Sequence, residues 1–140
     1  MAAYVKYNQF VEDLGRKVHN LNSDTLKVAL TNTAPNVVTH KVLADITQIS
    51  AGNGYASGGT ASSGTSFAQS NGTAKLDGGN VVFTASGGTI GPFRYAVLYN
   101  ATASGGPLIA YFDYGSALTL QDGEQLTVDF ITNVDIFTLT

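Results

Sequence analysis

Short runs of alternating apolar and polar residues, separated by turn-forming residues, fill the sequence from residue 80 onward. Such alternation is typical of strands, because successive side chains of a strand point to opposite faces of a sheet. The expected strands are Val81–Ala85, Arg94–Tyr99, Leu108–Tyr114, Leu118–Leu120, Gln125–Ile131 and Val134–Leu139. Asp122-Gly123 lies between two of them, and this dipeptide is typical of a β-hairpin. The series predicts an all-β fold, an antiparallel β-sandwich that is jelly-roll-like.

The first half of the chain is expected to join the same domain, which then comprises residues 1–140. Thr25–Thr31 alternates as a strand does. Apolar residues at helical spacing predict a short helix or an irregular segment at Asn8–His19, within an N-terminal arm of about residues 1–22. Similar spacing over Val42–Ile49 predicts one or two helical turns packed on the sheet.

A Gly/Ser/Thr-rich excursion of about residues 51–79 interrupts the pattern. A structureless loop of this length is uncommon inside a compact domain. Two interpretations stay open: a flexible excursion, or an extended ribbon that gains order from a neighbour. Tyr55 and Phe67 are its large aromatic residues.

Composition and charge narrow the classes of function. The seven Lys and Arg residues are scattered and the net charge is −3, so no nucleic-acid partner is expected. The chain has no cysteine, which excludes disulfides and thiolate chemistry. No apolar run approaches the ~20 residues of a membrane span, and the first residues lack the features of a secretory signal. We therefore expect no membrane partner and synthesis in a cytoplasm.

No catalytic or metal-binding motif is found in the sequence. His19 and His40 are the only histidines, and neither lies in a catalytic or metal-ligand pattern. Carboxylates cluster at Asp113, Asp122, Glu124 and Asp129, as a glycoside hydrolase requires, but their positions at turns and on an outward strand face favour a structural role. The sequence therefore predicts a non-enzymatic protein with no cofactor and no metal.

Five segments in a fixed order carry a resemblance to a known family. They are Asp24–Thr31, Ala44–Ile46 followed by Gly52–Tyr55, Gly91–Asn100, Pro107–Gly115 and Asp122–Glu124. Together they span about residues 24–130, and in this order they resemble the small structural virion proteins of tailed bacteriophages, whose members include capsid cement (decoration) proteins.

The resemblance implies an architectural function on the capsid exterior. The chain would bind and stabilise the outer surface of the capsid by bridging subunits of the major capsid protein, and would itself form a homo-oligomer, a dimer or a trimer. Candidate assembly contacts are aromatic residues in otherwise polar segments: Tyr4, Tyr7, Phe10, Tyr55 and Phe67. An equal alternative is that these residues pack on the chain's own core.

A tail-fibre or baseplate module that recognises a host surface glycan is the alternative function. It requires an exposed aromatic platform, for which the candidates are Tyr95, Tyr99, Tyr111 and Tyr114. Their alternation within strands places at least half of them in the core.

Overall fold

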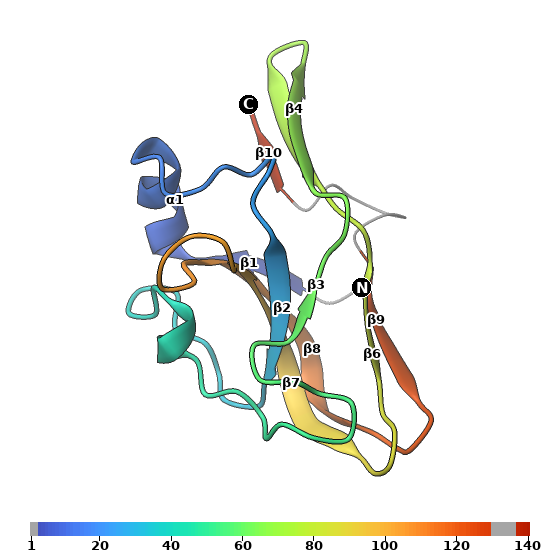
Figure 1. Ribbon diagram of the computed structural model, residues 1–140. Helices are drawn as coiled ribbons and strands as arrows, with labels where there is room; N and C mark the ends of the chain where they lie inside the picture. The colour runs from blue at the N-terminus through green and yellow to red at the C-terminus, as the bar shows by residue number, and fades with distance from the viewer. Residues whose placement is uncertain (1–2, 130–136) are drawn as a thin grey trace.

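The computed structural model describes residues 3–129 and 137–140 and consists mostly of antiparallel strands (Figure 1). Among the described residues, strands make up 47% and helix 8%, which confirms the predicted all-β, sandwich-like class. The helical elements are α1 (Asn8–Gly15) and the 3-10 turn η1 (Leu43–Asp45). The strands are β1 (Ala3–Lys6), β2 (Leu26–Thr31), β3 (Thr60–Ala61), β4 (Ser66–Ser70), β5 (Thr73–Asp77), β6 (Val81–Thr84), β7 (Ile90–Asn100), β8 (Leu108–Leu120), β9 (Gln125–Val128) and β10 (Phe137–Leu139).

The main sheet has five strands in the order β1-β8-β7-β2-β3, and every described pairing in it is antiparallel. Its pairings are nested, because β1 joins β8 and β2 joins β7 around the central β7–β8 hairpin. The remaining described strands form two smaller sheets, β6-β9 and β10-β5-β4.

Both faces of the main sheet are buried, so β7 is apolar on both sides. Leu98 belongs to the larger core, which Val81, Phe83 and Val128 of the β6–β9 pair close from the opposite layer. The neighbouring Val97 faces the other way, into a smaller core. There Leu43 and Ile46, in and beside η1, cover the sheet. The helical turn predicted within Val42–Ile49 is therefore confirmed.

The N-terminal segment is part of the sandwich, in contrast to the predicted arm. β1 pairs along the edge of β8, and the helix expected at Asn8–His19 ends at Gly15. Phe10 on α1 is fully buried in the larger core. The burial of one apolar helix face fixes this segment, and the sequence pattern showed that face but not the preceding strand.

The excursion of residues 51–79 is an extended ribbon ordered by the chain's own strands. Gly59 crosses β2 so closely that a Cβ there would lie 1.7 Å from the Val28 carbonyl oxygen. Further on, β4 and β5 form a hairpin that projects from the sandwich (Figure 1). Asn71 (φ +52°) and Gly72 (φ +83°) form its two-residue turn, and two positive φ angles define a type I′ turn.

The hairpin predicted at Asp122-Gly123 is wrong, although the turn itself is present. The Glu124 N–H donates to Gln121 O at 2.9 Å, but β9 pairs with β6 and not with β8. The main chain of the turn is instead hydrogen-bonded to the residue that follows β6, since the Gly123 N–H donates to Ala85 O. The predicted break between residues 114 and 118 is also absent, because β8 continues through an irregular register opposite Arg94. The predictions at residues 130, 131 and 134–136 lie outside the described residues.

Candidate functional site

Three of the five candidate assembly contacts are core residues. Tyr7 and Phe10 are fully buried, and Tyr55 is nearly so. The alternative that the sequence left open, packing on the chain's own core, therefore describes these three. Tyr4 on β1 is 38% exposed and Phe67 on β4 is half-buried, so these two keep accessible surface.

Hydrogen bonds explain why Tyr55 is an internal residue. Its hydroxyl donates to Gln48 Oε1 at 2.7 Å and accepts the Leu30 N–H at 3.1 Å. The Tyr55 hydroxyl thus supplies an acceptor for the Leu30 N–H of β2, at a position that the short strand β3 does not reach. Burial raises the pKa of Tyr55 to about 12, so the hydroxyl keeps its proton as a donor.

The four tyrosines considered for a glycan platform do not form one surface. Tyr95 and Tyr99 are buried, and the Tyr99 hydroxyl donates to Gly58 O at 2.5 Å. Tyr111 packs edge-to-face on Tyr95 with ring centroids 5.8 Å apart, beside the smaller core. Tyr114 packs beside the larger core instead. The tyrosines therefore lie on opposite faces of the sheet, and two of them lack exposed rings.

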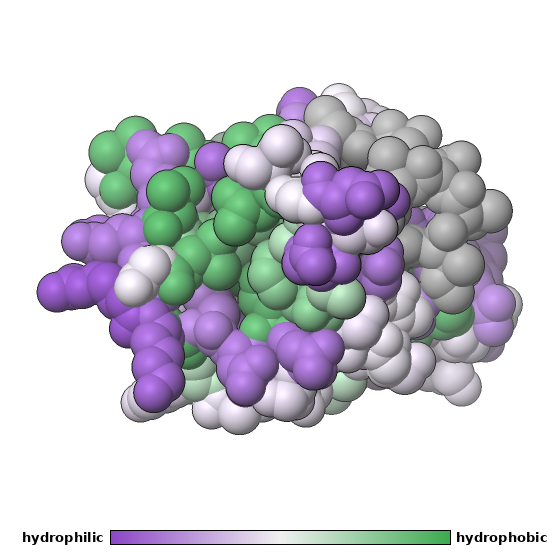
Figure 2. Space-filling view, turned by 90° about the horizontal axis from the view of Figure 1, so that it is seen from above, coloured by the Kyte–Doolittle hydropathy of each residue, from purple (hydrophilic) through white to green (hydrophobic). Residues whose placement is uncertain are grey.

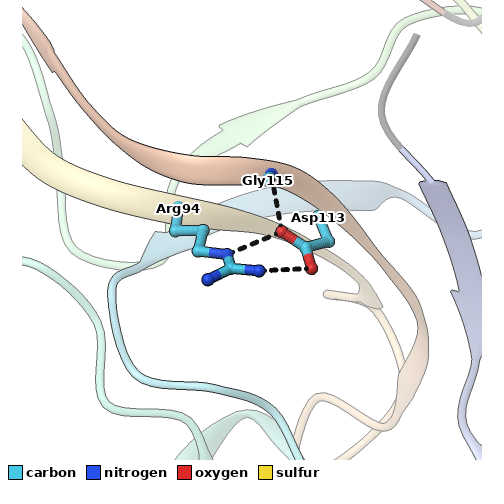
Figure 3. Close-up of polar contacts among 3 residues, drawn as sticks. All are labelled: Arg94, Asp113 and Gly115. Atoms are coloured by element: carbon cyan, nitrogen blue, oxygen red, sulfur yellow. Dashed lines mark hydrogen bonds and ion pairs between the residues drawn. The ribbon is translucent and has the colours of Figure 1, made fainter.

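Asp113, one of the clustered carboxylates, is held by Arg94 across the β7–β8 pair (Figure 3). Arg94 Nε donates to Asp113 Oδ1 at 2.8 Å, and its Nη2 donates to Oδ2 at 3.1 Å. The Gly115 N–H donates to the same Oδ1 at 2.7 Å. Arg94, followed by the Gly115 amide, lowers the pKa of Asp113, which therefore stays ionised. This geometry stabilises the irregular part of β8.

Asp122 and Glu124, two further acidic residues of that cluster, serve turns. Asp122 Oδ1 accepts the Gly87 N–H at 3.0 Å, and Glu124 Oε1 accepts the Gln121 N–H at 2.6 Å. Across residues 3–129 and 137–140, no group of three or more His, Asp or Glu side chains is arranged to hold a metal ion. Asp122 and Glu124 are thus each engaged in local structure, as expected for acids at turns.

A pocket of about 590 Å³ opens at the end of the molecule where α1, the β4–β5 hairpin and β10 meet. Its apolar wall comes from segments far apart in the sequence: Leu14, Val18, Leu21, Phe67 and Leu139. Figure 2 views this end and shows apolar residues bordered by hydrophilic ones. An apolar pocket with a few polar groups is the usual form of a ligand or side-chain site.

His19 lies in the pocket wall and is only 9% exposed. Its Nδ1 lies 3.0 Å from Asn100 Nδ2. The Asn100 amide has one orientation, because its Oδ1 accepts the N–H groups of Thr102 and Ala103 and its Nδ2 also donates to Asp24. Nδ1 of His19 must therefore be the acceptor, which places the proton of the neutral ring on Nε2.

The Nε2 atom of His19 is buried and has no hydrogen-bond partner among residues 3–129 and 137–140. Burial lowers the pKa of His19, against the opposing effects of Asp13 and Asp24, which favours the neutral ring. A buried N–H donor without an acceptor is costly and rare in native structures. This donor in an apolar pocket is the most distinctive polar feature of the site.

Sequence reasoning did not find this pocket. Leu14, Val18 and Leu21 have helical spacing in the sequence, but α1 ends at Gly15 and the later two residues line the pocket from a loop. The Asn71-Gly72 dipeptide is typical of a two-residue hairpin turn and could have predicted the β4–β5 hairpin, which carries Phe67 to the pocket. The long-range contacts of His19 with Asn100 have no local sequence signature.

Comparisons with protein-family models, curated proteins and solved structures found no match for this chain. Within residues 3–129 and 137–140, no helix has the length and apolar character needed to span a bilayer. The fold and the site define an antiparallel β-sandwich with a projecting hairpin and a pocket at its base.

Proposed function

We propose that this protein is a non-enzymatic structural protein of a tailed-phage virion, a capsid cement or decoration protein. It binds the outer surface of the capsid and stabilises it by bridging subunits of the major capsid protein. The ordered sequence segments over residues 24–130 support the proposal through their family resemblance. A cement protein adds interface area across capsomer boundaries, so it needs extended contact surfaces and not a catalytic site.

The observation that carries the proposal is the projecting β4–β5 hairpin (Figure 1). β4 lies at the edge of its sheet, and its sequence, Ser66–Ser70, contains neither a charged residue nor proline. Soluble proteins usually protect such edges with charge, proline or a covering segment, because an open edge pairs with other chains. A projecting edge without charged residues or proline favours a role in contact with another polypeptide.

Partners and location follow from this function. The proposed partners are the major capsid protein and further copies of this chain, as a dimer or trimer on a symmetry axis of the shell. The protein would be made in the host bacterial cytoplasm and reside on the capsid exterior, without cofactor, nucleic acid or membrane.

Co-sedimentation with expanded phage shells that lack the protein tests the proposal. We expect hundreds of copies per shell, saturating at a fixed ratio to the major capsid subunit, because a cement protein repeats with the lattice. Absence of binding, or a few copies confined to one vertex, would refute it. That outcome would make a tail component that recognises a host glycan the leading alternative.

A further inference from the structure

We propose that the pocket between α1, the hairpin and β10 receives an apolar side chain of an extended partner segment, while a main-chain carbonyl of that segment accepts a hydrogen bond from His19 Nε2. The inference rests on the proposed function for the identity of the partner, a segment of the major capsid protein. It adds the chemistry by which that segment is recognised: an apolar residue, an extended backbone and a neighbouring carboxylate.

The unpaired Nε2–H of His19 indicates what the occupant must supply. The Asn100 amide fixes the proton on Nε2, so the site offers a donor and requires an acceptor. A main-chain carbonyl is the acceptor present at every residue of a polypeptide. Nε2 is covered in the free chain. A bound carbonyl therefore reaches it only after a wall side chain rotates, and the hydrogen bond then removes the cost of the buried donor.

The apolar walls of the pocket suit an apolar side chain of the segment, and its volume of about 590 Å³ leaves room for the neighbouring backbone. Leu14 lines it from α1, Val18 and Leu21 from the loop that follows, and Phe67 and Leu139 from β4 and β10. Leu139 is 51% exposed in the free chain, so it has apolar surface left to bury. Burial of an aliphatic or aromatic anchor in such a pocket is the usual source of affinity in a peptide interface.

Charge at the rim favours an acidic neighbour of the anchor. Lys17 lies at the pocket and is exposed, and no described carboxylate forms an ion pair with it. The nearby Asp24 carboxylate is already engaged, because Oδ2 accepts the Asn20 N–H and the Asn100 amide. A carboxylate next to the anchor would complement Lys17 and guide the segment into register.

Free main-chain groups at the edge of β4 would orient the partner segment by pairing with its backbone. Phe67 pairs with Leu76 and Gln69 with Ala74 in the hairpin. Both are positions whose main-chain groups point away from β5, since the closing pair of a two-residue hairpin is the hydrogen-bonded one. The Phe67 N–H already donates to Asn22 Oδ1 at 3.2 Å. The outward groups of Gln69 remain for a strand added beside the pocket.

The test selects random dodecapeptides displayed on yeast against the full chain. Peptides that bind should share an aliphatic or aromatic residue beside Asp or Glu. Leu139→Ser should weaken their binding about tenfold, equivalent to about 1.4 kcal/mol, while Val38→Ser, an exposed apolar residue away from the pocket, should leave binding unchanged. Binding should also shift the ¹⁵N resonance of His19 Nε2 and weaken with added salt.

The outcomes separate this inference from the proposed function. If the wild-type chain and Leu139→Ser sediment equally with shells and no selected peptide depends on Leu139, the pocket inference is wrong while the cement function stands. If the chain does not bind shells but the peptides bind as described, the pocket inference holds and the assignment of the major capsid protein as its partner is wrong. If Leu139→Ser instead abolishes a dimer seen by light scattering, the occupant is a second copy and the inference is overturned.

Discussion

His19 lies in the loop after α1, and its ring connects that loop to Asn100 at the end of β7 and to Phe10 on α1, whose ring centroid lies 5.2 Å away. Burial lowers its pKa below the ordinary 6.5, while Asp13 and Asp24 act in the opposite direction. The unfolded chain therefore takes up this proton first as the pH falls. We expect the free energy of unfolding in urea to decrease between about pH 7.5 and 5.5, the range of an ordinary histidine.

Two variants isolate this effect. His19→Gln should flatten the pH dependence in that range, whereas His40→Gln should retain it. Asp45 and Asp113 also have shifted pKa values, but theirs are lowered. Their contribution is fully present above the ordinary value near 4 and is lost only at more acidic pH, outside the range measured. An unchanged slope in His19→Gln would contradict the assignment.

Tyr55 should behave as a core residue in a stability measurement. Tyr55→Phe removes the acceptor of the buried Leu30 N–H, while Gln48 keeps the Gly58 N–H as a partner. An unsatisfied buried donor costs about 1–3 kcal/mol, and we expect a loss of that size in chemical denaturation. Tyr114→Phe is the control, since the Tyr114 hydroxyl forms no hydrogen bond within the described residues. Equal effects of the two variants would contradict this role for Tyr55.

At the scale of elements, Asp113 should determine the order of the irregular part of β8. It accepts the Gly115 N–H and pairs with Arg94 on β7. We expect Asp113→Ala to accelerate hydrogen exchange of the Gly115 amide, because that amide loses its acceptor. Arg94→Ala leaves that acceptor in place and should change Gly115 exchange much less. Equal acceleration in both variants would mean that the ion pair, and not the carboxylate–amide bond, holds this segment.

The β4–β5 hairpin should depend on the backbone of its turn. Gly72 has φ +83° and nothing within 4 Å of a built Cβ, so Gly72→Ala introduces strain but no clash. We expect a loss of about 1–2 kcal/mol, the cost of a left-handed L-residue, and faster exchange of the hairpin amides. Gly15→Ala is the matched control, also in open space but without a positive φ. It should be neutral or stabilise α1 by up to about 1 kcal/mol.

For the whole molecule, local patterns predicted the sandwich and its central strands but not which strands pair. Leu26, Val28 and Leu30 alternate as expected, and the structure buries all three in the larger core. The Asp122-Gly123 dipeptide predicted that β9 pairs with β8, but β9 pairs with β6. That choice depends on contacts between residues far apart in the sequence. The pocket was missed for the same reason: Leu14, Phe67 and Leu139 meet only in the folded chain.

A shortened hairpin separates the stability of the sandwich from its assembly. Removal of Gln69, Ser70, Thr73 and Ala74 takes two residues from each strand. The Asn71-Gly72 turn then closes on the pair Ala68–Lys75 with each side chain on its original face. The residues of the hairpin that reach the core, Phe67 and Leu76, remain in place.

This variant should still unfold in one cooperative transition, because the main sheet and the β6–β9 layer are untouched. Its binding to shells should fall by at least about tenfold, or about 1.4 kcal/mol, since the projecting edge beyond Phe67 is gone. Val38→Ser serves again as the control and should sediment as the wild-type chain does. Full occupancy of shells by a folded, shortened variant would exclude the hairpin tip as a capsid contact and direct attention to Tyr4 on the edge strand β1.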